Sequence, residues 1–556
     1  MLIGRSLSIC LVASLAVQSF ALTTAHAKSV AAKGAVATAA ASGVNAIAIA
    51  SALGSANYIN LRNSVISTNV IAPLYKARGN QPIFVEGTTA TANLGKLKTL
   101  INRAHLIGLD KEDYSNGDLD AASIQLSNPQ AALETELLAA QALVNIASDL
   151  AVGRVALRAI DQETDFQKAK FDGYSTLNSL LSSQDLQSAL EQLEPQHQQY
   201  TQLKQVLEQL YSVKANGGWK AISGAAALKP GVVSADVPGI RQRLADLNYL
   251  PSSERDNAST TYDRTLVEAV KLFQAGLKLD ADGICGKMCF GALKTSIDQR
   301  IAQVNVNLER WRWLPKTLGS KYIFVNLARQ ELRVNENGVD VISMRTVNGR
   351  LLRRTPTMVD RVYEVVLNPY WTVPNSIALK DLIPAQKKDP NYMMSKNVRV
   401  LDSNKAEIDP RYVDWVAIGS RIPYTLRQDP GPQNSLGTVK FSLTNSRAIY
   451  LHDTPHHEDF PSTTRLLSSG CVRLERPHEL AEYLLQGTEY DSYQIQNVIA
   501  QYYTYPAHTV RLKAAVAAYL TYLTASVGEQ GEIQFTPDYY GQDERMINVS
   551  KNREGF

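Results

Sequence analysis

The stretch YLHDTPHHEDFPSTTRLLSSGCVRLERP, Tyr450 to Pro477, carries a histidine and, nineteen residues after it, a cysteine. Three roles are open to Cys471: a nucleophile, a metal ligand or a small buried hydrophobe. A thiol attacks as the thiolate, so a nucleophilic cysteine needs a lowered pKa and a base nearby. His452 ends the predicted strand RAIYLHD, Gly470 permits a tight turn that presents backbone amides, and Arg473 adds positive charge. The pattern favours a nucleophile, which predicts fast reaction of Cys471 with electrophiles at neutral pH.

SSGCVR, together with the preceding YLHDT, resembles the catalytic motif of L,D-transpeptidases of the YkuD fold, which crosslink peptidoglycan. Ser469 stands where many members have histidine, as in the large multidomain periplasmic branch of the YcbB type. The resemblance runs from about residue 75 to the C-terminus. Its further motifs are YKARGNQPIF, LIGLDKEDY, YDRTLVEAVKLFQAGLKLDADGICG, NLERWRWLP, NPYWTVPNSIA and RQDPGPQNSLGTVKF.

The resemblance implies that the Cys471 thiolate attacks the carbonyl of the third residue of a tetrapeptide stem, with His452 as the base. It implies that amides near Gly470 and the Tyr450 hydroxyl stabilise the oxyanion. It further implies that Ser469 and Arg473 position the loop or the substrate. The partners implied are donor and acceptor peptidoglycan stems, other cell-wall synthesis proteins and carbapenem inhibitors, with no nucleic acid, metal or cofactor.

Several competing interpretations remain open. Water as acceptor would make the protein an L,D-carboxypeptidase, a protein lysine would make it a lipoprotein-attaching enzyme, and a vestigial site would leave a peptidoglycan-binding scaffold. HDTPHHEDF holds several metal-ligand side chains, but their spacing fits no closed zinc pattern. Trp371 either lines the cleft or anchors the sheet. We interpret the basic run GRLLRRTP, Gly349 to Pro356, as solvated surface.

The N-terminus predicts export. Residues 1–27 contain Arg5, an apolar run from Leu7 to Leu22 and a small-x-small cleavage pattern at Ala25 to Ala27. This arrangement is typical of a secretory signal peptide, with an uncleaved anchor as the alternative. We therefore expect a periplasmic protein. The formal charge of +4 does not indicate a nucleic-acid surface.

After cleavage, three cysteines would remain in an oxidising compartment. Cys285 and Cys289 are four residues apart and would form a disulfide if local geometry brings their side chains together. The sequence leaves this pairing open. Cys471 would then be the free thiol.

The chain of 556 residues is too long for one core and predicts a multidomain α+β protein. Residues 28–57 are an Ala-rich flexible linker by composition, and helical periodicity over 58–217 predicts a helical scaffold domain. Three short helices over 235–298 predict a module that resembles peptidoglycan-binding domains. Alternating runs over 318–505 predict a mainly-β catalytic domain, with a lid insertion at about 376–433. Residues 506–556 are expected to be a tail, ending in a hairpin, that packs on the other domains.

Overall fold

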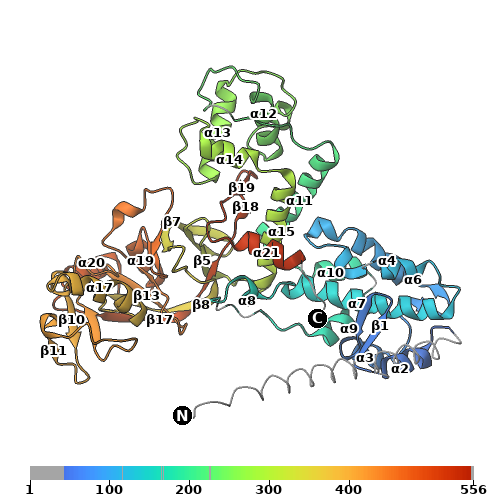
Figure 1. Cartoon of the computed structure of the whole chain (residues 1–556), viewed down its shortest axis with the longest axis horizontal. Helices are drawn as coiled ribbons and strands as arrows, with labels where there is room; N and C mark the ends of the chain where they lie inside the picture. Colours follow the sequence, from blue (N-terminus) through green and yellow to red (C-terminus); the bar gives the residue numbers. More distant parts are fainter. Residues whose placement is uncertain are drawn as a thin grey trace, which may run out of the picture.

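The structure, a computed structural model, describes residues 43–551 except 55, 116, 165, 167, 184, 225 and 226. Three lobes meet at a central group of helices: a helical lobe, a small helical module and a mainly-β lobe (Figure 1). The predicted signal peptide, residues 1–27, and the linker as far as residue 42 lie outside the described residues. The multidomain α+β architecture predicted from the sequence is confirmed.

The helical lobe is built around α7 (Pro129–Val152), which Asn128 caps by accepting a hydrogen bond from the Gln130 amide. This helix is apolar and long enough to cross a membrane, but 72% of its most apolar window is buried, as in the core helix of a folded domain. The elements around it are α2 (Ala46–Gly54), β1 (Tyr58–Leu61), β2 (Ser64–Ser67), α3 (Thr68–Ala77), β3 (Val85–Glu86), β4 (Thr89–Ala90), α4 (Ala92–Asn102), η2 (Ala104–Ile107), α5 (Glu112–Ser115), α6 (Asp118–Ser123), α8 (Leu157–Ile160), α9 (Gly173–Ser182), α10 (Leu186–Glu191) and α11 (Gln198–Ala215).

The flexible linker predicted over residues 28–57 is wrong for its described part. Val44, Ile49 and Ala52 are buried, and α2 packs against α3 in the same hydrophobic core as α7. Composition misled the prediction because alanine-rich sequence suits both a linker and a helix, and small side chains allow a helix to pack closely. Only tertiary contacts distinguish the two.

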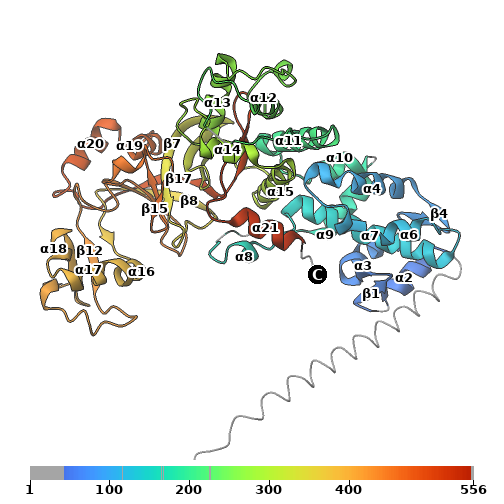
Figure 2. The ribbon, with the colours of Figure 1, turned by 45° about the horizontal axis from the view of Figure 1, so that its top comes forward.

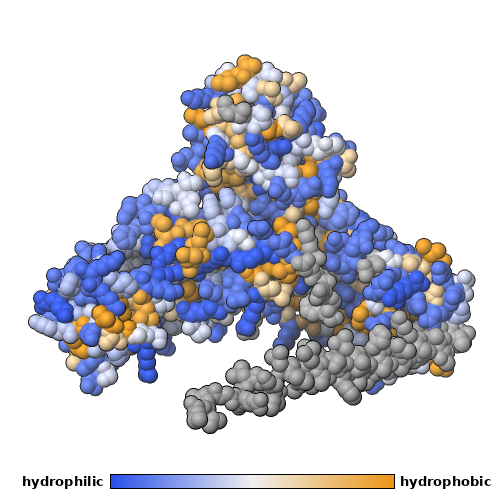
Figure 3. Space-filling view, in the orientation of Figure 1, coloured by the Kyte–Doolittle hydropathy of each residue, from blue (hydrophilic) through white to orange (hydrophobic). Residues whose placement is uncertain are grey.

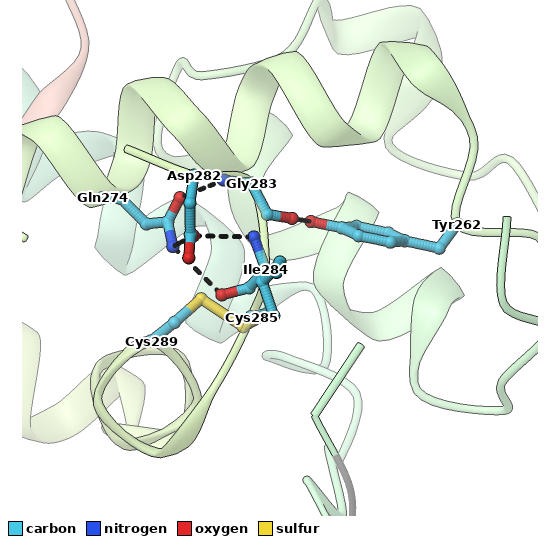
Figure 4. The surroundings of a disulfide bond; sticks show 7 residues. All are labelled: Tyr262, Gln274, Asp282, Gly283, Ile284, Cys285 and Cys289. Atoms are coloured by element: carbon cyan, nitrogen blue, oxygen red, sulfur yellow. Dashed lines mark hydrogen bonds between the residues drawn. A yellow bond between two sulfur atoms is a disulfide. The ribbon is translucent and has the colours of Figure 1, made fainter. Parts of the chain in front are cut away.

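The small module contains α12 (Val237–Asp246), η3 (Ser252–Glu254), α13 (Arg264–Gly276) and α14 (Lys287–Lys294). Cys285 and Cys289 form a disulfide that ties the loop before α14 to the first turns of that helix (Figure 4). Gln274 fixes the same loop by bonding to Asp282 and to the backbone of Gly283. The pairing that the sequence left open is therefore present.

The mainly-β lobe contains, among the described residues, a nine-stranded sheet of order β15-β7-β16-β14-β13-β8-β17-β5-β6. Helices α19 (Pro477–Leu484) and α20 (Ser492–Ala500) contribute to its core. The strands are β5 (Lys321–Asn326), β6 (Glu331–Glu336), β7 (Val339–Gly349), β8 (Met358–Leu367), β13 (Val439–Leu443), β14 (Leu451–His452), β15 (Leu466–Ser468), β16 (Val472–Leu474) and β17 (His508–Thr521).

The prediction that residues 506–556 form a tail outside the catalytic domain is wrong for β17. This strand lies inside the sheet, antiparallel to β8 and parallel to β5, so the catalytic domain does not end at residue 505. The predicted hairpin is present as β18 (Ala525–Val527) and β19 (Ile533–Phe535), and a helix, α21 (Gln542–Lys551), follows it. Non-local pairing decided the position of β17, and local periodicity carries no information about it.

The predicted lid insertion is a folded subdomain with its own core and a four-stranded sheet, order β11-β10-β12-β9. Figure 2 shows it as a separate lobe at the edge of the large sheet. Its elements are β9 (Trp371–Thr372), α16 (Asn375–Ile377), η4 (Ala378–Leu382), α17 (Ile383–Lys388), α18 (Tyr392–Ser395), β10 (Val398–Leu401), β11 (Glu407–Ile408), η5 (Pro410–Tyr412) and β12 (Thr425–Gln428).

The lobes meet at α15 (Ile297–Trp313), which a capping box at Ser296 and Gln299 begins. It packs against α11, α7 and α21. Glu309 near its end accepts bonds from the Val155 amide and the Trp313 indole and pairs with Arg312. The visible face of the assembled lobes is largely hydrophilic, with scattered apolar patches (Figure 3).

Candidate active site

Cys471 lies in the turn between β15 and β16, where the chain must bend sharply. Gly470 has a φ of +125°, which a residue with a side chain rarely adopts. The Ser468 hydroxyl accepts a hydrogen bond from the Gly470 amide at 3.1 Å and donates one to the Cys471 carbonyl at 2.6 Å. The turn is thus held rigidly, and it places the thiol 3.5 Å from the Ala448 carbonyl.

His452 lies on the strand beside this turn. β14 and β16 are parallel neighbours, with His452 opposite Arg473, so both side chains are on one face of the sheet. The imidazole is buried, and its Nδ1 lies 2.5 Å from the Asp453 carbonyl oxygen. Because a carbonyl only accepts hydrogen bonds, Nδ1 carries the proton, and Nε2 has a free lone pair.

The electrostatics leave both groups neutral at rest. Burial, reinforced by Arg473, lowers the pKa of His452 to about 4. Burial raises the pKa of the Cys471 thiol to about 11, against opposing contributions from the Tyr450 backbone, Lys440 and Arg473. The resting pair is thus thiol and neutral imidazole, which disagrees with the expectation of a reactive thiolate at neutral pH. Proton transfer must accompany attack on a bound carbonyl.

Lys440 is a site residue that the sequence interpretation missed. It lies opposite His452 on β13, with its ammonium 4.5 Å from the centre of the Tyr450 ring. Burial lowers its pKa, and the cation favours a thiolate at Cys471. The sequence signal for Lys440 was the alternation of apolar and polar residues in VKFSL. This alternation predicts a strand, but it does not identify the strand that pairs with it.

Of the predicted oxyanion donors, some are available in the structure and one is not. The Gly470 amide is already bonded to Ser468, so Gly470 shapes the turn and is not a free donor. The Cys471 amide has no hydrogen-bond acceptor among the described residues. Tyr450 lies beside His452, with ring centroids 6.3 Å apart, and burial and Cys471 raise the pKa of its phenol, which therefore stays a donor. Cys471 N–H and Tyr450 O–H remain available for an oxyanion.

The remaining predicted residues lie around the turn. Arg473 pairs with Asp459 at 3.2 Å and so steadies the loop that contains η6 (His457–Asp459). Ser469 is exposed and accepts bonds from Arg353 at 3.1 Å and Arg350 at 3.4 Å. Trp371, on β9, pairs with Gln428 and packs on the core of the inserted subdomain, which is the anchoring position.

Asp453 is a second residue that the sequence interpretation missed. Its carboxylate accepts bonds from the Thr438 amide and hydroxyl at 2.8 and 2.7 Å, where the inserted subdomain rejoins the sheet. A Cβ on Gly437, which has a φ of +61°, would collide with this carboxylate. Asp453 thus fixes that junction through its side chain and orients His452 through its carbonyl.

The histidines of HDTPHHEDF do not converge. His456 pairs with Glu458, and His457 lies 3.3 Å from Asp453. Within the described residues no three His, Cys, Asp or Glu side chains lie close enough together to hold a metal ion.

Three family matches cover most of the described chain. Residues 320–498 match the family described as "L,D-transpeptidase catalytic domain", YkuD. Residues 233–293 match "Putative peptidoglycan binding domain", and residues 69–207 match "Scaffold domain".

A curated protein of Haemophilus influenzae, named "Putative L,D-transpeptidase", is 36% identical over 258 residues, which are 46% of this chain and 50% of that protein. A solved L,D-transpeptidase from Xylanimonas cellulosilytica is 14% identical; the match covers 54% of this chain and 100% of that one, with a TM-score of 0.16. A solved L,D-transpeptidase from Stackebrandtia nassauensis is 12% identical; the match covers 54% of this chain and 97% of that one, with a TM-score of 0.22. The chain spans half the length of the curated relative, so the family assignment is made domain by domain. Residues 320–498 therefore form an L,D-transpeptidase catalytic domain of the YkuD fold, which this chain joins to a scaffold domain and a peptidoglycan-binding domain.

Proposed function

We propose that this protein is a peptidoglycan L,D-transpeptidase that forms 3→3 crosslinks through an acyl-enzyme on Cys471. The observation that carries the proposal is the geometry at β14 and β16. A free thiol lies in the turn that leads into β16, and a neutral imidazole whose Nδ1 is fixed by the Asp453 carbonyl lies on the neighbouring strand β14. The match to a peptidoglycan-binding domain supports the substrate class.

The first half-reaction would acylate the enzyme. As the Cys471 sulfur attacks the carbonyl of the third stem residue, His452 Nε2 takes the thiol proton. The tetrahedral oxyanion would accept hydrogen bonds from the Cys471 amide and the Tyr450 hydroxyl, each typically worth about 10²–10³ in rate. The carbon–nitrogen bond then breaks, His452 returns the proton to the leaving amine, and D-Ala departs.

The second half-reaction would transfer the acyl group. The side-chain amine of a diaminopimelate on a second stem attacks the thioester and passes a proton to His452. The Cys471 thiolate leaves and takes this proton from His452, so both the thiol and the imidazole are neutral again. The peptidoglycan-binding module supports an insoluble substrate of this kind, and the predicted signal peptide supports a periplasmic location.

The test incubates the purified protein with disaccharide-tetrapeptides and follows the products by mass spectrometry, beside Cys471→Ala. A dimer that lacks one D-Ala, absent in the variant, is the expected result. Tripeptide monomers alone would point to a carboxypeptidase, and attachment to a lysine-bearing peptide in place of a stem would point to lipoprotein attachment. Absence of any product from the unmodified protein would contradict the proposal and leave a binding scaffold.

A thiol nucleophile should also be acylated by carbapenems. Intact mass should increase by one carbapenem on the unmodified protein and stay constant for Cys471→Ala. An adduct that persists in the variant would contradict Cys471 as the nucleophile.

A further inference from the structure

The basic run Gly349–Pro356, which we interpreted as solvated surface, packs against the turn that carries Cys471. The Arg350 amide donates to the Ser468 carbonyl at 3.0 Å, and the Arg353 amide donates to the Arg350 carbonyl at 2.8 Å. The Arg354 carbonyl lies 3.8 Å from where a Cβ on Gly470 would be. Two guanidinium groups are therefore held beside the turn that carries Cys471.

Arg353 makes a two-pronged ion pair with Asp381, one contact of which measures 2.8 Å from Nη2 to Oδ1. Its Nη1 also donates to the Ser469 hydroxyl. Arg350 approaches the same carboxylate at 3.6 Å. Around this cluster the described residues thus place two cations, one carboxylate and one hydroxyl, so that a positive charge is left over.

The carboxylate of this cluster, Asp381, comes from the inserted subdomain and not from the loop that carries the two arginines. It lies on η4. The inserted subdomain has its own core and connects to the large sheet at its two ends. Its side chain is 38% exposed, against 17% for Arg353. The Asp381 carboxylate is thus open to replacement from solvent, because the planar guanidinium fork suits any carboxylate of the same shape.

We propose that Arg353 is a receptor for a free carboxylate of the substrate stem peptide, and that Asp381 occupies the receptor until the substrate replaces it. This inference rests on the proposed function. Ser469 and Cys471 are two residues apart, so their Cα atoms are at most about 7 Å from each other. A carboxylate one or two residues from the scissile carbonyl can therefore reach Arg353 while the carbonyl lies at the thiol.

Three free carboxylates of a tetrapeptide stem satisfy this description: the α-carboxylate of the γ-linked D-glutamate at position two, the side-chain carboxylate of diaminopimelate and the terminal D-Ala carboxylate. A carboxamide version of each one distinguishes the three. The same exchange couples binding to the inserted subdomain, because the incoming carboxylate releases Asp381 from Arg353.

The experiment measures dissociation constants by calorimetry in full-length Cys471→Ala, which binds without turnover. Four ligands are compared: the tetrapeptide and three versions of it in which the D-glutamate, the diaminopimelate or the terminal D-Ala carboxylate is a carboxamide. One of the three amidations should weaken binding about 10- to 100-fold, the range of a charged hydrogen bond. With Arg353→Gln added, the tetrapeptide should bind as weakly as that carboxamide, and the difference between the two ligands should vanish.

Asp381→Asn decides between exchange and simple scaffolding. If the carboxylates compete, Asp381→Asn should tighten tetrapeptide binding severalfold, opposite in sign to Arg353→Gln. If the pair is only structural, both variants should weaken binding alike, which would overturn the inference. Equal affinities for all four ligands would also overturn it. Arg354→Gln, in the same loop, contacts neither Asp381 nor Ser469 among the described residues and should match the parent. Turnover by the protein with intact Cys471 tests the proposed function separately.

Discussion

The imidazole of His452 should set an unusually low acid limit for activity. Its lowered pKa, about 4, means that the base stays neutral as the pH falls through the ordinary histidine range. We expect kcat/KM for acylation to fall only near pH 4. Arg473→Gln removes a positive charge, raises the pKa of His452 and should move this limb upward by about one pH unit.

Pre-steady-state acylation over pH 3.5–8 in short incubations measures this limb. Arg476→Gln serves as the control, because Arg476 pairs with Glu479 and does not contribute to the lowered pKa of His452. An acid limb near pH 6.5 in the unmodified protein would contradict a buried neutral imidazole.

The thiol of Cys471 should react slowly with small electrophiles until the solution is alkaline. Its raised pKa, about 11, leaves little thiolate at pH 7, and each pH unit below that value should change the alkylation rate about tenfold. Lys440→Met removes a cation that favours the thiolate and should slow iodoacetamide alkylation at pH 8 by about 3- to 10-fold.

Mass spectrometry of the alkylated protein gives these rates, with Lys388→Met in the inserted subdomain as the control. Rapid labelling at pH 7 with no pH dependence would show that the thiolate is already formed at rest, and would favour the expectation drawn from sequence alone.

At the scale of elements, the Cys285–Cys289 disulfide should stabilise the small helical module without entering the chemistry. A loop of about five residues closed by a disulfide contributes roughly 2 kcal/mol, mainly by restricting the unfolded chain. Cys285→Ser with Cys289→Ser should lower the unfolding midpoint of this module and leave acylation of Cys471 unchanged.

Hydrogen exchange in α13 and α14 measures that loss, and exchange in β13 and β8 is the internal control. Unchanged protection in α14 would mean that the contacts of Gln274 suffice to hold the loop.

Across the whole molecule, Glu309 should determine how firmly the helical lobe is held against α15. It is buried with Arg312 and bonds to Val155, so Glu309→Gln leaves a buried guanidinium without its carboxylate. Breaking such a pair costs about 3–5 kcal/mol. We expect faster hydrogen exchange in α15 and α7, with turnover of a small soluble stem peptide retained.

Glu208→Gln on α11 is the matched control, because its side chain is exposed. Loss of exchange protection confined to the large sheet, with α15 unaffected, would contradict the role of Glu309 at this junction.

The amino-acid sequence by itself determined the local features of this protein. These are the Cys471 turn with its obligatory Gly470, the strand that ends at His452, the three helices of the small module and the disulfide-compatible spacing of its cysteines. Each depends on neighbours within a few residues, where periodicity and backbone conformation act directly.

Only the tertiary structure decided the rest, because it depends on contacts between distant segments. β17 enters the sheet through pairing with β5 and β8. The alanine-rich segment at α2 becomes a buried helix. Lys440 meets His452 across a strand pair, and Arg353 meets Asp381 from a separate subdomain. The pKa values of His452 and Cys471 move in the directions observed because burial, which no local pattern encodes, outweighs the charges around them.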